Sequence, residues 1–192
     1  MIQTWSLDYK SRFPEKSEAW HNYSRNNIYY YYFEGKIWLT SDLLERFNIG
    51  SIIDYGCGNA NSMRNIKDIP IFRYDPFVDK FKERPTEPAD LVVAYNVLSV
   101  IELDYMKNTL TDIFSLSNNM VIFCVPLMGA ETSRKAGWYL KKILPYDEQL
   151  GFECISAQVI DIEKYKELTR LSIPNANSDS FLFVFMQKKQ GA

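Results

Sequence analysis

Residues 51–61, with the sequence SIIDYGCGNAN, join an apolar run to a cluster of small residues. The run Ser51–Tyr55 is typical of a buried strand, and the glycines at 56 and 58 indicate a tight turn after it. Glycine adopts positive φ at low cost and leaves room for a ligand against the turn. In open α/β sheets, ligands bind at such carboxyl ends of strands. The stretch therefore predicts a ligand-binding loop or, more plainly, a tight turn without a ligand.

Length and composition favour a single domain over residues 1–192. A chain of 192 residues, 46% of them hydrophobic, suffices for one sizeable core and is short for two domains. The net charge of −2 gives no strong field that would attract nucleic acid. The cysteines are odd in number and far apart, which is typical of a reducing compartment, and neither a signal peptide nor a membrane span is recognisable. We expect a cytoplasmic protein without a membrane partner.

The chain divides into two regions of different pattern. Residues 1–50 are rich in aromatic side chains, including the run Tyr29–Tyr32, and predict an N-terminal helical extension or lid. From residue 51 onward, short apolar runs alternate with helical stretches, which is typical of an α/β core with a mostly parallel sheet flanked by helices. The predicted strands are 51–55, 71–74, 91–95, 120–125, 154–160 and 181–187, and the predicted helices are 41–47, 61–67, 104–116 and 133–144.

The glycine turn has a specific form. Residues 54–60 resemble motif I of the class I S-adenosylmethionine-dependent methyltransferases, an acid, any one residue and then GxGxG, whose last glycine is often another small residue. The dinucleotide fingerprint needs glycine or alanine where Asn61 stands, so nicotinamide or flavin binding is disfavoured. The resemblance implies a Rossmann-like fold with S-adenosylmethionine as its cofactor. The cofactor contacts that it implies are Asp54, Gly56, Cys57, Gly58, Asn59 and Ala60.

A second candidate element follows about twenty residues later, where the run Ile71–Tyr74 ends in Asp75. A carboxylate there can accept hydrogen bonds from both ribose hydroxyls. Pro76 and Phe77 complete the expected cofactor contacts, with Phe77 placed to stack on the adenine. The pair Asp75-Pro76 is also an ordinary turn initiator, which is the plainer interpretation.

The third element is the run Asn96-Val97-Leu98-Ser99-Val100-Ile101. It resembles the segment after strand four of class I enzymes, where a pattern such as Asp-Val-Leu-Glu-His-Ile is found. The resemblance places Asn96, Val97 and Leu98 beside the methionine portion of the cofactor, and Asn96 is the candidate catalytic residue. Because Val100 replaces the histidine, no histidine base is expected here. Transfer from a sulfonium depends largely on proximity and orientation, so a good nucleophile needs no strong base.

An unusual spacing refines the fold. Only about fifteen residues separate Asp75 from Asp90, whereas a strand with two flanking helices needs about thirty. The usual third strand should be missing, and the strand before Asp75 should be a sheet edge. This region looks like the compact methyltransferases encoded by bacteriophages. Adenine contacts are then expected from Phe77 and Glu87, and a solvated surface from Lys80, Lys82, Glu83 and Arg84.

Other catalytic classes are disfavoured. His21 is the only histidine, and the cysteines lack CxxC spacing, so neither a histidine-based triad nor a metal site is predicted. The NPPY and Pro-Cys motifs of DNA base methyltransferases are also missing. The leading interpretation is a methyltransferase that acts mainly by positioning, with a small molecule, a protein or a nucleic acid as acceptor.

Two alternatives remain open. One is a protein that binds S-adenosylmethionine as a non-catalytic partner or regulatory subunit, for example in a phage or host complex that modifies nucleic acid. The other is a related nucleotide-binding fold that does not use S-adenosylmethionine.

Overall fold

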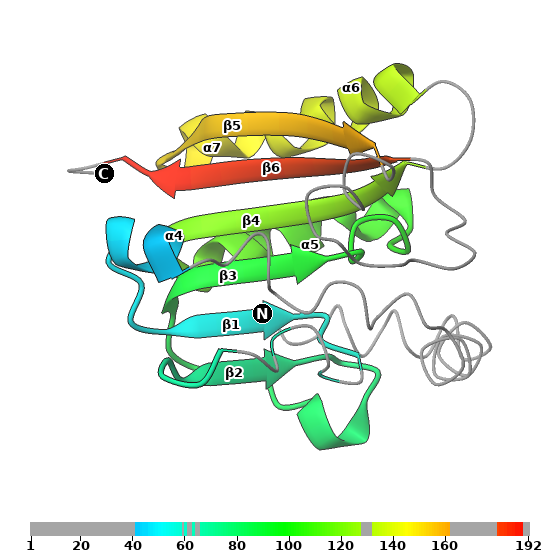
Figure 1. Ribbon diagram of the computed structural model, residues 1–192. Coiled ribbons are helices and arrows are strands. Elements are labelled where there is room, and N and C mark those ends of the chain that lie inside the picture. Colours follow the sequence, from blue (N-terminus) through cyan, green and yellow to red (C-terminus); the bar gives the residue numbers. More distant parts are fainter. Residues whose placement is uncertain are drawn as a thin grey trace.

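The computed structural model describes residues 41–58, 60, 63, 66–127, 132–161 and 180–189, so the predicted extension over residues 1–40 lies outside the described part. One sheet of six strands organises the chain, in the order β2-β1-β3-β4-β6-β5 (Figure 1). Strands β2, β1, β3 and β4 are parallel, and β6 runs antiparallel to both of its neighbours. The bounds are α4 Ser41–Arg46, β1 Ile52–Tyr55, β2 Ile71–Tyr74, the 3-10 helix η1 Asp79–Phe81, β3 Ala89–Tyr95, α5 Leu103–Ser115, β4 Ser117–Leu127, α6 Thr132–Ile143, α7 Pro145–Leu150, β5 Phe152–Asp161 and β6 Ser180–Lys188.

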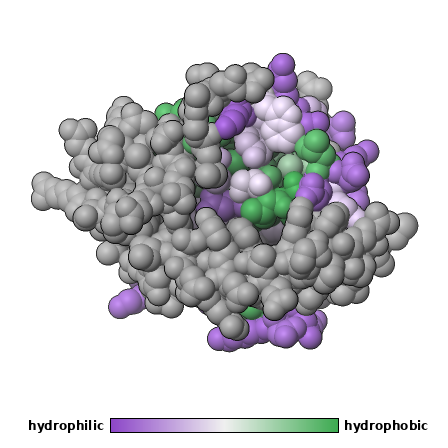
Figure 2. Space-filling view, turned by 90° about the vertical axis from the view of Figure 1, so that its right-hand side faces the viewer, coloured by the Kyte–Doolittle hydropathy of each residue, from purple (hydrophilic) through white to green (hydrophobic). Residues whose placement is uncertain are grey.

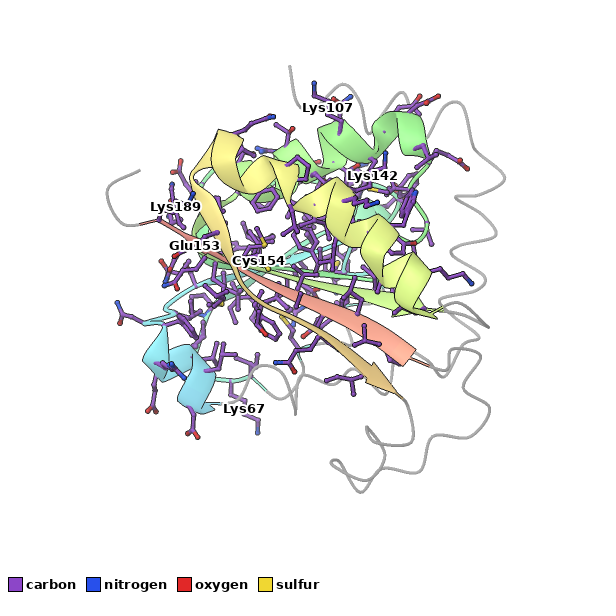
Figure 3. The ribbon with its side chains drawn as sticks, turned by 90° about the horizontal axis from the view of Figure 1, so that it is seen from above. Lys67, Lys107, Lys142, Glu153, Cys154 and Lys189 are labelled. Carbon is purple, nitrogen blue, oxygen red and sulfur yellow. The ribbon has the colours of Figure 1, made fainter. Side chains whose placement is uncertain are left out.

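The central strands β1, β3 and β4 are buried on both faces of the sheet, to which their successive side chains point in turn. In β1, Ile53 belongs to the core beneath α5, whereas Ile52 belongs to the core that includes Leu44 of α4. Viewed from above, α5 and α6 cover one face of the sheet and α4 lies on the other (Figure 3). Burial on both sides explains why these strands are continuous apolar runs and not alternating ones.

The predicted strands are confirmed, each within a few residues of its expected bounds. Helices 41–47, 104–116 and 133–144 correspond to α4, α5 and α6. The helix predicted over 61–67 is wrong at every position that the structure describes there, because Met63 lies in a turn and Ile66 and Lys67 have no regular structure. Sequence analysis also missed α7, a helix of only six residues that begins at Pro145.

The β2–β3 connection, residues 75–88, is as short as the spacing predicted. It is described throughout and contains a single element, η1, so β2 forms one edge of the sheet. Phe72 of β2 is 55% exposed, as a side chain on the edge strand of a sheet can be.

Candidate functional site

Parallel pairing brings three strand ends to one edge of the sheet. Tyr55 of β1 lies opposite both Tyr74 of β2 and Ala94 of β3. Gly56 and Asp75 follow directly, and Asn96 comes two residues after Ala94. Figure 2 faces this edge, where hydrophobic and hydrophilic side chains meet within a small area. The three elements that the sequence singled out are therefore brought together.

The backbone of the glycine loop, residues 56–60, has positive φ at Gly56 (70°), Gly58 (51°) and Ala60 (58°). Gly56 has a second constraint, since a Cβ there would lie 2.5 Å from Cγ2 of Val97. The sequence suggested that glycine leaves space for a ligand. At position 56 the side chain of Val97, from the segment after β3, already occupies this space. Glycine therefore allows the glycine loop and the segment after β3 to lie in contact.

The amides of the glycine loop are largely used within the protein. The N–H groups of Gly56 and Cys57 both donate to the carbonyl of Tyr74, at 2.7 and 3.2 Å. The amide of Gly58 donates to Oδ2 of Asp75 at 2.9 Å. These three amides therefore have acceptors within the protein. Asn59 lies outside the described residues.

Asp75 joins the glycine loop to the turn after β2. Its carboxylate is only 3% exposed and accepts a second hydrogen bond at Oδ1 from the amide of Phe77, at 2.9 Å. A carboxylate oxygen has two lone pairs, so each oxygen keeps the capacity to accept another donor. Asp75 thus has a structural task that the sequence did not reveal, in addition to the predicted contact with ribose.

Cys57 and Asp54 are buried beneath this loop. Burial raises the pKa of the Cys57 thiol, and the charges of Asp54 and Asp75 raise it further. The thiol therefore stays protonated at neutral pH and is a poor nucleophile, because reactivity belongs to the thiolate. Cys57 is a packing residue in the structure.

Asn96 carries a polar atom that lacks a partner among the described residues. Its backbone has φ of 59°, a conformation that asparagine tolerates, and its backbone N–H donates to the carbonyl of Cys124 at 2.8 Å. The side-chain Oδ1 is buried and accepts no hydrogen bond from any described residue. Buried polar atoms are nearly always paired, so this oxygen is unusual among the described residues of the strand ends.

The residues after Asn96 divide between core and surface. Val97 and Leu98 are buried in the core beneath α5, so only their backbone is available for a cofactor. Ser99 donates to the carbonyl of Asn96 at 2.8 Å and closes the turn. Val100, where class I enzymes often have histidine, is 39% exposed at this edge.

No family model matches the chain, and no curated protein matches it in sequence. Solved structures do match. The magnesium protoporphyrin IX methyltransferase of Synechocystis PCC 6803, solved with bound S-adenosylhomocysteine, aligns over 98% of this chain and 100% of its own, with a TM-score of 0.60 and 11% identity. The methyltransferase in the complex with the Haloferax volcanii Trm112 activator gives coverages of 93% and 98%, a TM-score of 0.58 and 12% identity. The plantazolicin methyltransferase BamL gives 98% and 97%, 0.53 and 13%.

The fold is that of the class I S-adenosylmethionine-dependent methyltransferases. Within this fold Phe77, one of the predicted cofactor contacts, packs with Ile101 against Tyr105 of α5. Pro76 is half-buried beside it, whereas Glu87 is exposed. The ring of Phe77 thus links the turn after β2 to α5 and to the segment after β3.

Sequence analysis missed one buried polar network. Arg84 was expected in solvent, yet its side chain is 18% exposed and its Nε lies 2.8 Å from Oδ1 of Asp112, which is 1% exposed. Lys80, Lys82 and Glu83 are exposed as expected. The available signal was Asp112, an acid directly before Ile113 and Phe114 in the apolar stripe of α5, where a charge is costly unless it is paired.

Among the described residues, no group of three or more histidine, cysteine or acidic residues is arranged to hold a metal ion. No helix in this part of the chain is long and apolar enough to cross a membrane. His21 lies outside the described residues.

Proposed function

We propose that this chain is an S-adenosylmethionine-dependent methyltransferase whose cofactor lies along the ends of β1, β2 and β3. The observation that carries the proposal is the buried Oδ1 of Asn96, which accepts no hydrogen bond from the described residues at the edge where the motifs meet. The cofactor has an ammonium group in its methionine portion, a donor of the kind that this oxygen lacks. The fold and the motif-like residues at this edge support the same proposal.

The other residues divide the binding work. The carboxylate of Asp75, fixed by the amides of Gly58 and Phe77, is placed to accept the ribose hydroxyls. The ring of Phe77 is placed beside the adenine, and the glycine loop provides close backbone approach. S-adenosylmethionine supplies an electrophilic methyl group on a sulfonium, and the protein holds the acceptor atom in line with it.

Catalysis would depend mainly on orientation. Among the described residues of this edge, Cys57 stays protonated, Val100 stands in the place of the histidine, and the carboxylate of Asp75 already accepts two hydrogen bonds. A good nucleophile held at near-attack distance needs no strong base, since proximity alone removes much of the barrier. The acceptor class, whether small molecule, protein or nucleic acid, is best found by direct screening.

Calorimetry with S-adenosylmethionine and S-adenosylhomocysteine tests the proposal. We expect both to bind, and Asp75→Ala to weaken binding by about 1–3 kcal/mol, the range for losing a charged hydrogen-bond partner. Asp79→Ala is the matched control, because this acid of the same connection is exposed and has only a long contact to Lys82, at 3.9 Å. Failure of the wild-type chain to bind either compound would overturn the proposal.

A second experiment separates the two tasks of Asp75. A cofactor analogue without ribose hydroxyls should bind the wild type more weakly, and Asp75→Ala should then add little to that loss. If instead the losses from the analogue and from the substitution add fully, the carboxylate does not contact the hydroxyls and serves only to shape the loop.

Val100 favours one alternative, a chain that binds the cofactor without catalysing transfer. An exposed aliphatic residue, not a histidine, faces this edge, and Ser99 is occupied by its own turn. Incubation with cofactor labelled in the methyl group distinguishes the two functions. Transfer to a small molecule, a protein or a nucleic acid establishes the enzyme, whereas tight binding without transfer to any of these classes favours the binding protein.

A further inference from the structure

Arg84 lies near the end of the β2–β3 connection and anchors it to α5. Its guanidinium makes three hydrogen bonds, from Nε to Asp112 at 2.8 Å, from Nη2 to Ser115 Oγ at 3.3 Å and from Nη1 to the carbonyl of Pro85 at 3.0 Å. The planar fork of arginine suits several fixed acceptors at once, which a lysine ammonium does not reproduce. The connection that Arg84 anchors joins β2, at the edge of the sheet, to β3 and adds no strand to the sheet.

The contact continues through Asp112 to the first strand. The second oxygen of Asp112 accepts a hydrogen bond of 2.7 Å from the hydroxyl of Tyr55. Burial raises the pKa of the Asp112 carboxyl, and the hydrogen bonds from Tyr55 and Arg84 oppose this. A buried carboxylate is stable only with such partners, so the three side chains form one unit.

The unit of Arg84, Asp112 and Tyr55 adjoins both parts of the proposed cofactor site, the glycine loop and the turn at Asp75. Tyr55 directly precedes Gly56, and its ring packs edge-on against Tyr74 with centroids 5.2 Å apart. Tyr74 directly precedes Asp75, and its carbonyl accepts the amides of Gly56 and Cys57. A displacement of Tyr55 or of the β2–β3 connection would therefore shift both the glycine loop and Asp75.

We propose that Arg84 is a positioning residue for the cofactor site, acting through Asp112 and Tyr55 in place of the missing third strand. The inference rests on the proposed function, because the site that it positions is the S-adenosylmethionine site. Arg84 is connected to the glycine loop through Asp112 and Tyr55. Its effect is to fix the relative placement of the glycine loop and the Asp75 turn.

The test compares Arg84→Gln and Tyr55→Phe with Lys82→Gln, which removes an exposed cation two residues away. Affinity for S-adenosylhomocysteine is measured by calorimetry, well below the melting temperature of each variant. We expect Arg84→Gln and Tyr55→Phe to weaken binding by about tenfold, within the range of coupling through packed networks, and Lys82→Gln to change it by less than about twofold. Tyr55→Phe keeps the Arg84–Asp112 pair, so it provides the answer if Arg84→Gln does not fold.

Two further measurements separate positioning from a general loss of stability. In the Asp75→Ala background, Arg84→Gln should cause little additional loss of affinity, because the turn that it positions has already lost its ligand group. 5′-Methylthioadenosine lacks the amino acid portion of the cofactor. Arg84→Gln and Tyr55→Phe should weaken its binding by as large a factor as they weaken the binding of S-adenosylhomocysteine. Unchanged affinity in folded Arg84→Gln and Tyr55→Phe, with normal binding by the wild type, overturns the inference. Absence of binding by the wild type overturns the proposed function first.

Discussion

At the scale of single residues, the site depends on a few positions where geometry leaves one choice. Gly56 combines a φ of 70° with contact to Val97, so two separate penalties exclude other residues. Asn96 also has positive φ, yet it retains a side chain whose oxygen lies buried at the edge. Positive φ thus allows Gly56 to lie against Val97, and at Asn96 it accompanies a buried side-chain oxygen.

Gly56→Ala should lower the free energy of unfolding by more than about 1–2 kcal/mol, the cost of positive φ for an L-residue, because the clash with Val97 adds to it. Urea unfolding measures the change. Gly137→Ala is the control, since this glycine of α6 has nothing within 4 Å of an added Cβ. It should stabilise the protein by about 0.5–1 kcal/mol. Similar effects of both substitutions would contradict the assignment.

The three cysteines should differ in reactivity. Burial raises the pKa of Cys57 and of Cys124, whereas Cys154 is only half-buried. A raised pKa means that the thiolate is scarce at neutral pH, and only the thiolate reacts with iodoacetamide. Mass spectrometry of the native protein at about pH 7.5 should show labelling of Cys154 well before Cys57 or Cys124. Early labelling of Cys57 would show that the glycine loop opens.

At the scale of elements, the sheet is fixed at both ends of its central strands. The carboxyl ends of β1 and β3 meet through Gly56 and Val97. At the opposite edge, Oδ2 of Asp90 accepts hydrogen bonds from the amide of Gly50 at 2.9 Å and the hydroxyl of Ser51 at 3.0 Å. The acid that opens β3 is therefore a structural link and lies far along the strand from the candidate site.

Asp90→Ala should lower the free energy of unfolding by about 1–3 kcal/mol, because the donors at Gly50 and Ser51 lose their acceptor. Thermal or urea denaturation measures this loss, with Glu87→Ala as the control for removal of an exposed acid nearby. The affinity for S-adenosylhomocysteine should stay unchanged in the folded variant. A large loss of affinity would mean that the amino end of β3, where Asp90 lies, is coupled to the carboxyl ends of the strands, where the candidate site lies.

At the scale of the whole molecule, one buried ion pair stabilises an architecture that lacks its third strand. Arg84, Asp112 and Tyr55 connect the β2–β3 connection, α5 and β1. Three side chains thereby join the β2–β3 connection to the rest of the fold. Its stability should accordingly depend on the charge of a single carboxyl group.

The destabilisation caused by Arg84→Gln should depend on pH. A raised pKa of Asp112 in the folded state means that this group favours folding below its unfolded value, about 3.9, and that the advantage is lost as pH rises through the folded value. Removing Arg84 raises the folded pKa further. The variant should therefore lose more stability relative to the wild type at neutral pH than in acid, where Asp112 is protonated in both proteins.

Urea unfolding at several pH values measures this dependence. The double variant Arg84→Gln, Asp112→Asn serves as the control, because it has no carboxylate to protonate at the site. A difference between wild type and Arg84→Gln that stays constant with pH would show that the pair contributes packing and not charge compensation.

The sequence by itself determined the sheet and the strand ends that carry the candidate site. Apolar runs, glycines and the short distance between Asp75 and Asp90 are local properties, and they predicted the strands, the edge position of β2 and the meeting of Gly56, Asp75 and Asn96. The failed helix over 61–67 and the missed α7 are short segments, where pattern is weakest and packing decides.

Only the tertiary structure decided how those residues are used. The amides of the glycine loop are occupied because Tyr74 and Asp75 come from another strand, and Gly56 is required because Val97 arrives from a third. Arg84 is indistinguishable from its exposed neighbours in the sequence, since its partner Asp112 lies twenty-eight residues away. Contacts between distant residues depend on packing of the whole chain, so the sequence indicated where the site lies and the structure showed what holds it.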